Sequence, residues 1–155
     1  MNNNELIKWN NNLACGIKII DTQHMGLVEM VNEMFNHVSG DEQTEREYFN
    51  KVIREAVRYV RTHFATEERI MRLTRFKGYA EHKKEHDKFI TTVIKNIYEY
   101  ESGGGSRMKL SSFTKFLKDW ILSHIALVDK QYFKHLHDIA GRKPSEDLNI
   151  CLKCS

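Results

Sequence analysis

Four stretches of this 155-residue chain carry apolar residues spaced alternately three and four positions apart, and of seven polar residues six occupy the same stripes and one lies beside a stripe. This spacing is typical of the buried face of a packed helix. In one stretch Val60, His63, Glu67 and Ile70 follow one another on a single stripe. A buried imidazole or carboxylate without a partner costs free energy, so these side chains must be satisfied inside the core. The seven polar residues are His24, His63, Glu67, His82, His86, His124 and Asp129.

The four stripes predict an all-α, up-down-up-down four-helix bundle with an N-terminal arm. The helices are expected over residues 21–38, 43–73, 79–101 and 108–140. Pro144, the single proline, lies beyond all of them, and glycine-rich turns separate the stretches. We predict one domain over residues 1–141, with the arm at 1–19, and a polar tail over 142–155 that contains a Cys-x-x-Cys motif.

Local signals suggest how the helices begin and end. Asp21 is a plausible N-cap of the first helix, and Thr44 and Glu47 have the spacing of a capping box at the second. Gly141 is a natural C′ residue for the fourth helix.

The seven polar residues are expected at one level of the bundle because alternate helices run in opposite directions. They fall near the start of the first helix, the end of the second, the start of the third and the later half of the fourth. His124 and Asp129 are five residues apart, which separates them by about 140° on an ideal helix. We therefore expect Asp129 to reach in from beside the stripe, or a local π-bulge to bring it round.

The ligand types favour a pair of transition-metal ions. Imidazole with carboxylate suits Fe, Zn, Cu or Ni, whereas Mg or Ca prefers a shell of oxygen atoms. Cysteine is absent from the seven, which disfavours a structural zinc site. Two carboxylates can bridge two ions, and five imidazoles then divide as three and two. The ion with two imidazoles keeps an open position for a small ligand.

The remaining histidines and cysteines carry weaker signals. His37, His135 and His137 fall outside the polar layer, and the last two suit the C-terminal end of a helix dipole. Cys15 is expected to be a small buried hydrophobe. For Cys151 and Cys154 we favour a frayed tail without function over a redox-responsive docking tail.

Composition excludes several classes of protein. The net charge is +3, and the cationic residues are interspersed with acidic ones, which argues against nucleic-acid binding. No apolar run approaches the roughly 20 residues that span a bilayer, and residues 1–12 lack the apolar segment of a secretory signal. The odd number of cysteines argues against a disulfide framework, so the expected compartment is the cytoplasm.

The sequence resembles the hemerythrin family, especially its bacterial members, over about residues 9 to 133, and every ligand position is filled. The matching pieces are Trp9, Gly16-Ile17-Lys18-Ile19-Ile20-Asp21-Thr22-Gln23-His24, His63-Phe64 with Glu67-Glu68, His82-Lys83-Lys84-Glu85-His86, and Trp120-Ile121-Leu122-Ser123-His124 with Asp129 and Tyr132.

The resemblance implies a non-haem, oxo- or hydroxo-bridged di-iron centre that binds O2 reversibly. His82, His86 and His124 would hold one iron, His24 and His63 the other, and Glu67 and Asp129 would bridge them. Phe64, Trp120 and Ile121 would line a dry O2 pocket, a role compatible with plain core packing. Tyr132 is expected to be simply packed, and Glu68 to be a surface charge.

Three functions remain open at this point. The first is an O2-binding protein for storage, delivery or sensing. The second is an enzyme that turns over peroxide or nitric oxide at the same centre, against which the lack of an obvious general acid or base weighs. The third is a sensor whose iron state is read by a partner protein. NO and small anions are alternative ligands of the open position, and the choice of iron rests on the resemblance.

Overall fold

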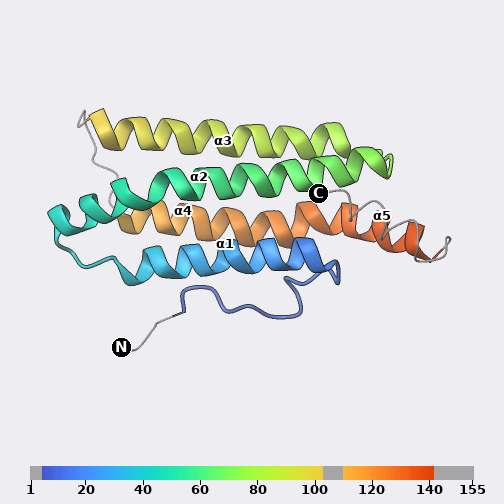
Figure 1. Ribbon diagram of the computed structural model, residues 1–155, viewed down its shortest axis with the longest axis horizontal. Helices are drawn as coiled ribbons and strands as arrows, with labels where there is room; N and C mark the ends of the chain where they lie inside the picture. The colour runs from blue at the N-terminus through green and yellow to red at the C-terminus, as the bar shows by residue number, and fades with distance from the viewer. Residues whose placement is uncertain (1–4, 103–109, 142–155) are drawn as a thin grey trace.

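The computed structural model describes residues 5–102 and 110–141, and within these ranges it contains helices and no strand. The elements are α1 (Lys18–Asn36), α2 (Glu42–Leu73), α3 (Tyr79–Ser102), α4 (Leu110–Ser123), a short π-helical segment η1 (His124–Asp129) and α5 (Lys130–Ala140). Helix α4, segment η1 and helix α5 follow one another without a break and form one rod (Figure 1).

Successive long helices run in opposite directions, so the predicted up-down-up-down bundle is confirmed (Figure 1). Helix α1 packs against α2 and α4, and α2 packs against α3 and α4. Helix α1 begins at Lys18, three residues before the predicted start, so the arm is shorter than expected. The predicted glycine-rich turn after Ser102 and the Cys-x-x-Cys tail lie outside the described residues.

The arm is tied to α1 along its length (Figure 1). The backbone N–H of Ile7 donates to Asn32 Oδ1 at 2.8 Å, and Asn32 Nδ2 donates to the Ile7 carbonyl at 2.9 Å. The prediction that Asp21 caps α1 is wrong, because the helix starts before it. Asp21 instead accepts the N–H groups of Cys15 at 2.7 Å and Gly16 at 2.9 Å, which fixes the end of the arm.

Two other predicted helix ends differ from the structure. Asp41, not Thr44, is the N-cap of α2, and its carboxylate accepts the Thr44 N–H at 2.7 Å. Asp41 precedes the first helical residue, Glu42, so it is placed to satisfy this otherwise free donor. Gly141 follows the last residue of α5, as predicted, but its φ of −70° is right-handed, so it lacks the left-handed conformation typical of a C′ glycine.

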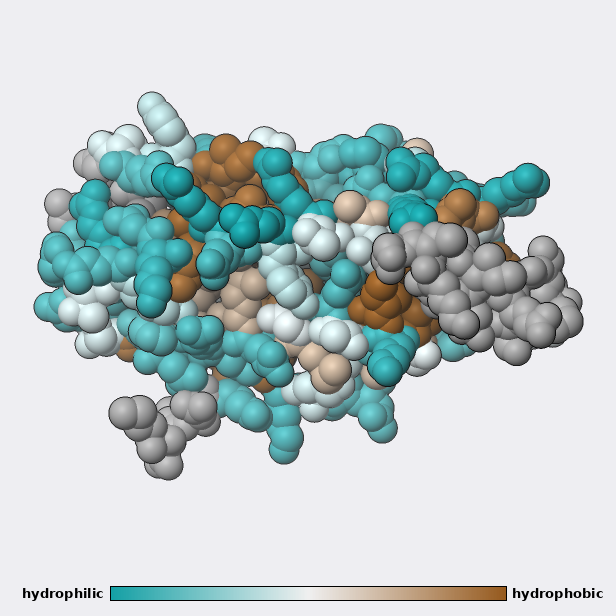
Figure 2. Space-filling model, in the orientation of Figure 1, coloured by the Kyte–Doolittle hydropathy of each residue, from teal (hydrophilic) through white to brown (hydrophobic). Residues whose placement is uncertain are grey.

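Two hydrophobic clusters fill the bundle on either side of the polar layer. The larger cluster contains Val31, Phe49 and Phe113 among others, and the smaller one contains Ile20, Ile70 and Tyr132 among others. The layer of buried histidines and carboxylates therefore has apolar packing above and below it. The face of the molecule in Figure 2 is mostly hydrophilic, with small apolar areas. None of the described helices has a segment long and apolar enough to cross a membrane.

Gly26 allows the side chain of Tyr59 to approach closely where α1 meets α2. A Cβ at this position would overlap the Tyr59 hydroxyl and ring, and that hydroxyl donates to the Gln23 carbonyl at 3.1 Å. Gly26→Ala is expected to displace the tyrosine, break this hydrogen bond and lower the free energy of unfolding by about 1–3 kcal/mol, as measured by urea denaturation.

A double-mutant cycle with Tyr59→Ala controls this prediction. Truncating the tyrosine removes the overlap, so Gly26→Ala should cost little in that background. Additive losses in the double variant would contradict the close contact.

Candidate metal centre

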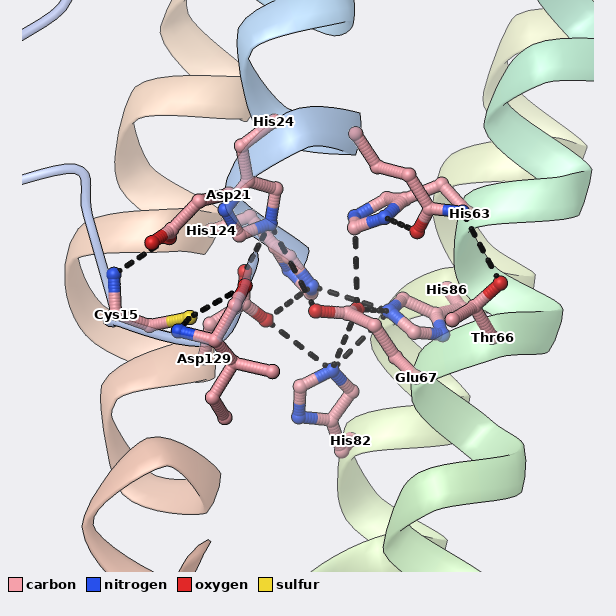
Figure 3. A network of polar contacts seen from close by, with 12 residues as sticks. Cys15, Asp21, His24, His63, Thr66, Glu67, His82, His86, His124 and Asp129 are labelled. Carbon is pink, nitrogen blue, oxygen red and sulfur yellow. Dashed lines mark hydrogen bonds and ion pairs between the residues drawn. The ribbon is translucent and has the colours of Figure 1, made fainter. Parts of the chain in front are cut away.

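The structure brings all seven predicted residues together in one buried layer (Figure 3). Each of their side chains belongs to a residue no more than 4% exposed. Helix α1 supplies His24, α2 supplies His63 and Glu67, α3 supplies His82 and His86, and η1 supplies His124 and Asp129. Four separate segments thus deliver their polar side chains to one level of the bundle.

Three imidazoles form one group within the layer. The Nε2 atom of His86 lies 3.1 Å from Nε2 of His82 and 3.2 Å from Nε2 of His124. These three nitrogens, together with Glu67, lie close enough to coordinate a single ion. His24 and His63 form a second group with Glu67.

The two carboxylates lie between these groups and contact both. Glu67 Oε2 lies 3.2 Å from Nε2 of His86 and 3.6 Å from Nε2 of His63, and its Oε1 lies 3.7 Å from Nε2 of His24. Asp129 Oδ1 lies 3.1 Å from Nε2 of His124, and its Oδ2 lies 3.4 Å from Nε2 of His24. This is the disposition that two bridging carboxylates would have between two ions.

The charge balance of the layer calls for cations. All four oxygens of Glu67 and Asp129, and both ring nitrogens of His24, are buried without a hydrogen-bond partner. Buried polar atoms in this state are costly, and two carboxylates concentrate negative charge in an apolar core. The donor set of imidazole nitrogen and carboxylate oxygen fits transition-metal ions and meets this demand.

Burial and the two carboxylates act in opposite directions on the pKa values of His24 and His63, and a different one prevails at each. Burial alone would lower the pKa of His24, but contacts with Asp129 and Glu67 outweigh it and raise the pKa to about 9. Burial lowers the pKa of His63 to about 4. Glu67 is desolvated, yet His63 and the other neighbouring imidazoles hold its pKa well below the ordinary value.

The π-helical segment η1 places the last carboxylate. His124 and Asp129 are its first and last residues, and both are buried. A π-helical turn holds more residues than an α-helical turn, so it brings residues five apart onto the same side. The expected π-bulge is therefore confirmed.

Two residues that touch the ligands from outside were not predicted to do so. Glu68 was expected to be a surface charge, but its side chain is only 16% exposed and its Oε1 lies 3.2 Å from Nδ1 of His86. Gln23 Oε1 lies 3.1 Å from Nδ1 of His63. Both are direct chain neighbours of predicted ligands, but neither lies on an apolar stripe, so the periodicity gave no signal for them.

Aromatic and aliphatic side chains cover the layer on the side of the larger hydrophobic cluster. The Phe64 ring stacks on His86 with centroids 3.8 Å apart, and the Trp120 ring stacks on His124 at 4.3 Å. Trp120 and Ile121 also line a cavity of about 30 Å³, whose other walls are all apolar. A volume of this size has room for one small molecule.

The other predicted assignments agree with the structure. The three histidines expected outside the layer bind backbone carbonyls: His37 that of Glu33, His135 that of Thr74 and His137 that of Cys15. Cys15 is buried, and desolvation raises the pKa of its thiol. Tyr132 is fully buried beside His82, and its hydroxyl has no hydrogen-bond partner.

Comparison with known proteins gives a consistent picture. A family model, the hemerythrin HHE cation binding domain, matches residues 15–136. The bacteriohemerythrin of Stenotrophomonas maltophilia is 32% identical over 127 residues, covering 82% of this chain and 79% of the relative. That of Methylococcus capsulatus is 30% identical over 112 residues, covering 72% and 82%. A crystal structure of wild-type hemerythrin matches with a TM-score of 0.71 and 26% identity, over 84% of this chain and 98% of that one.

The π-helical segment should tolerate the loss of one residue. Deleting Leu127, which is 68% exposed, converts the spacing of His124 and Asp129 to four, which suits a regular α-helix. We expect this variant to keep its helix content and its metal content per chain, as measured by circular dichroism and elemental analysis.

Deletion of Lys115 is the matched control, because its side chain is also exposed but it lies in regular helix α4. That deletion rotates His124 and Asp129 by about 100° relative to the part of α4 that precedes residue 115. It should therefore abolish metal binding. Loss of metal from the Leu127 deletion alone would contradict the role assigned to the bulge.

Metal binding should also displace a proton. With a pKa of about 9, His24 is protonated at neutral pH in the metal-free protein, and a metal ion must replace that proton. Titration with Co²⁺ in weakly buffered solution should therefore release a proton near neutral pH. The release should fall, and the apparent affinity should level off, above a pH of about 9. Equal release on both sides of this pH would contradict the raised pKa.

Proposed function

The chain belongs to the hemerythrin family, and we propose that it binds O2 reversibly at a non-haem di-iron centre. In this proposal His82, His86 and His124 hold one iron, His24 and His63 hold the other, and Glu67 and Asp129 bridge the two. The observation that carries the proposal is the position of the two carboxylates between the histidine groups, each of them in contact with both groups.

The number of imidazoles supports an open position on one side only. Three Nε2 atoms converge on one side of the carboxylates, whereas His24 and His63 alone serve the other side. The iron pair, when bound, supplies the redox-active centre at which O2 is held. With two imidazoles in place of three, the iron on that side would have a coordination position left for a diatomic ligand.

The protein's own contribution is to keep the site dry and weakly charged. Phe64, Trp120 and Ile121 form the proposed wall of the O2 pocket, and the neighbouring cavity is lined only by apolar side chains. An apolar wall excludes the water that would compete with or displace the ligand. Two carboxylates among five imidazoles carry less negative charge than carboxylate-rich di-iron bundles, which favours binding of O2 over oxidation of a substrate.

The proposal is tested by the metal content and the visible spectrum of the protein. Two irons per chain, a colourless reduced form and a coloured adduct that disappears when O2 is removed are the expected results. Irreversible conversion to the ferric form in air would instead favour an enzyme or a redox sensor. A protein that takes up no iron would overturn the proposal.

A single substitution tests the assignment of the open iron. His63→Ala removes one of its two imidazoles, so the coloured O2 adduct should be lost, as measured by absorption spectroscopy. His37→Ala is the control, since His37 lies outside the layer, where its ring bonds the Glu33 carbonyl and stacks on Tyr48. A full O2 spectrum in the His63 variant would contradict the ligand assignment.

A further inference from the structure

The outer faces of the two histidine groups differ in charge. On the three-histidine side, the ring of His86 is held from outside by the carboxylate of Glu68. On the two-histidine side, the ring of His63 is held from outside by the neutral amide of Gln23. We infer that this pair of contacts makes the two iron sites electronically unequal, with Glu68 stabilising the ferric state of the three-histidine iron. The inference rests on the proposed di-iron centre and adds Glu68 and Gln23 as positioning residues.

The hydrogen-bond network fixes which atom of Gln23 faces His63. Gln23 Nε2 donates to Thr66 Oγ1 at 3.1 Å, and the Thr66 hydroxyl is itself a donor, to the Thr62 carbonyl at 2.9 Å. The amide nitrogen is therefore committed to Thr66, which leaves the amide oxygen to accept the Nδ1–H of His63. This tautomer turns a bare Nε2 lone pair toward the metal layer.

Glu68 imposes the same tautomer on His86 but adds a negative charge. A carboxylate only accepts hydrogen bonds, so Nδ1 of His86 must donate and Nε2 is again bare. Lys83, on the neighbouring helix α3, is bound to both oxygens of Asp87 at 2.6 and 2.7 Å, so its charge acts on Glu68 through space while the Glu68 carboxylate keeps its contact with His86. The two contacts thus match in geometry and differ in charge.

Burial makes the Glu68 charge effective. Its side chain is 16% exposed and lines a hollow of about 520 Å³ between α2 and α3, whose wall also includes Arg61 and Asp87. A carboxylate bound to the outer nitrogen of a coordinating imidazole increases the basicity of that ligand, and a more basic ligand stabilises the higher oxidation state of its metal. A neutral amide orients the ring without this added charge.

Two substitutions that exchange charge but keep the side-chain length test the inference. Glu68→Gln removes the charge while retaining an oxygen that accepts from His86, and Gln23→Glu adds a charge beside His63. The measurement is the ferric-to-ferrous ratio of the iron-loaded protein at a fixed potential, followed by spectroelectrochemistry. We expect Glu68→Gln to lower this ratio about tenfold, equivalent to about 59 mV for one electron, and Gln23→Glu to raise it.

Glu81→Gln is the matched control. Glu81 adjoins the ligand His82 in the chain, but its side chain is 78% exposed and paired with Lys84, so its loss should leave the ratio unchanged. Opposite shifts in the two test variants would exclude a general loosening of the site, which would move both in the same direction.

The outcomes separate this inference from the proposed function. If the wild-type protein takes up no iron, both fall. If it holds two irons and binds O2 reversibly, but neither test variant shifts the ratio beyond the Glu81 control, the inference alone is overturned. If the Glu68→Gln variant does not load iron, the test rests on Gln23→Glu. A ferric-to-ferrous ratio that is unchanged or lower in that variant overturns the inference.

Discussion

The structure depends on the burial of two carboxylates in the centre of a helical bundle. Glu67 and Asp129 are fully buried, and none of their four oxygens has a hydrogen-bond partner. Imidazoles surround them, and protonated His24, with its raised pKa, sets one positive charge against their two negative charges. Helices α1, α2 and α3 and segment η1 each carry at least one residue of this layer, so the packing of the bundle and the binding of cations are coupled, as in other sites where the metal supplies part of the folding free energy. The two hydrophobic clusters hold the helices in the register that this layer requires.

The features that follow from helix periodicity were predictable, and those that depend on the path of the backbone were not. The stripes that contain His24, His63 and His82 place these residues in the core whatever the detailed packing, because an α-helix repeats every 3.6 residues. Asp21 was misassigned because α1 begins earlier, and its carboxylate serves the arm instead. At α2 several residues of capping type compete, and only the direction of the incoming chain selects Asp41.

The π-helical segment allows the continuous rod of α4, η1 and α5 to meet two structural requirements. Helix α4 must continue into α5 to cover both hydrophobic clusters, and the same rod must present both His124 and Asp129 to the layer. With these residues five positions apart, a regular helix would meet the second requirement only by reaching in from the side. Local widening to a π-turn meets both, and the extra residue is absorbed where Leu127 faces solvent.

The outer contacts of the ligands explain how one fold can adjust the chemistry of its centre. The inward face of the layer is fixed by seven side chains, and any change among them removes a ligand or a bridge. Gln23 and Glu68 lie just outside, and each sets a ring orientation through a single hydrogen bond. Their exchange for a charged or neutral partner alters the electron density on an imidazole without changing the donor atoms offered to the metal. Glu68 and Gln23 each line a hollow at the protein surface, so such exchanges are expected to leave the packing of the bundle intact.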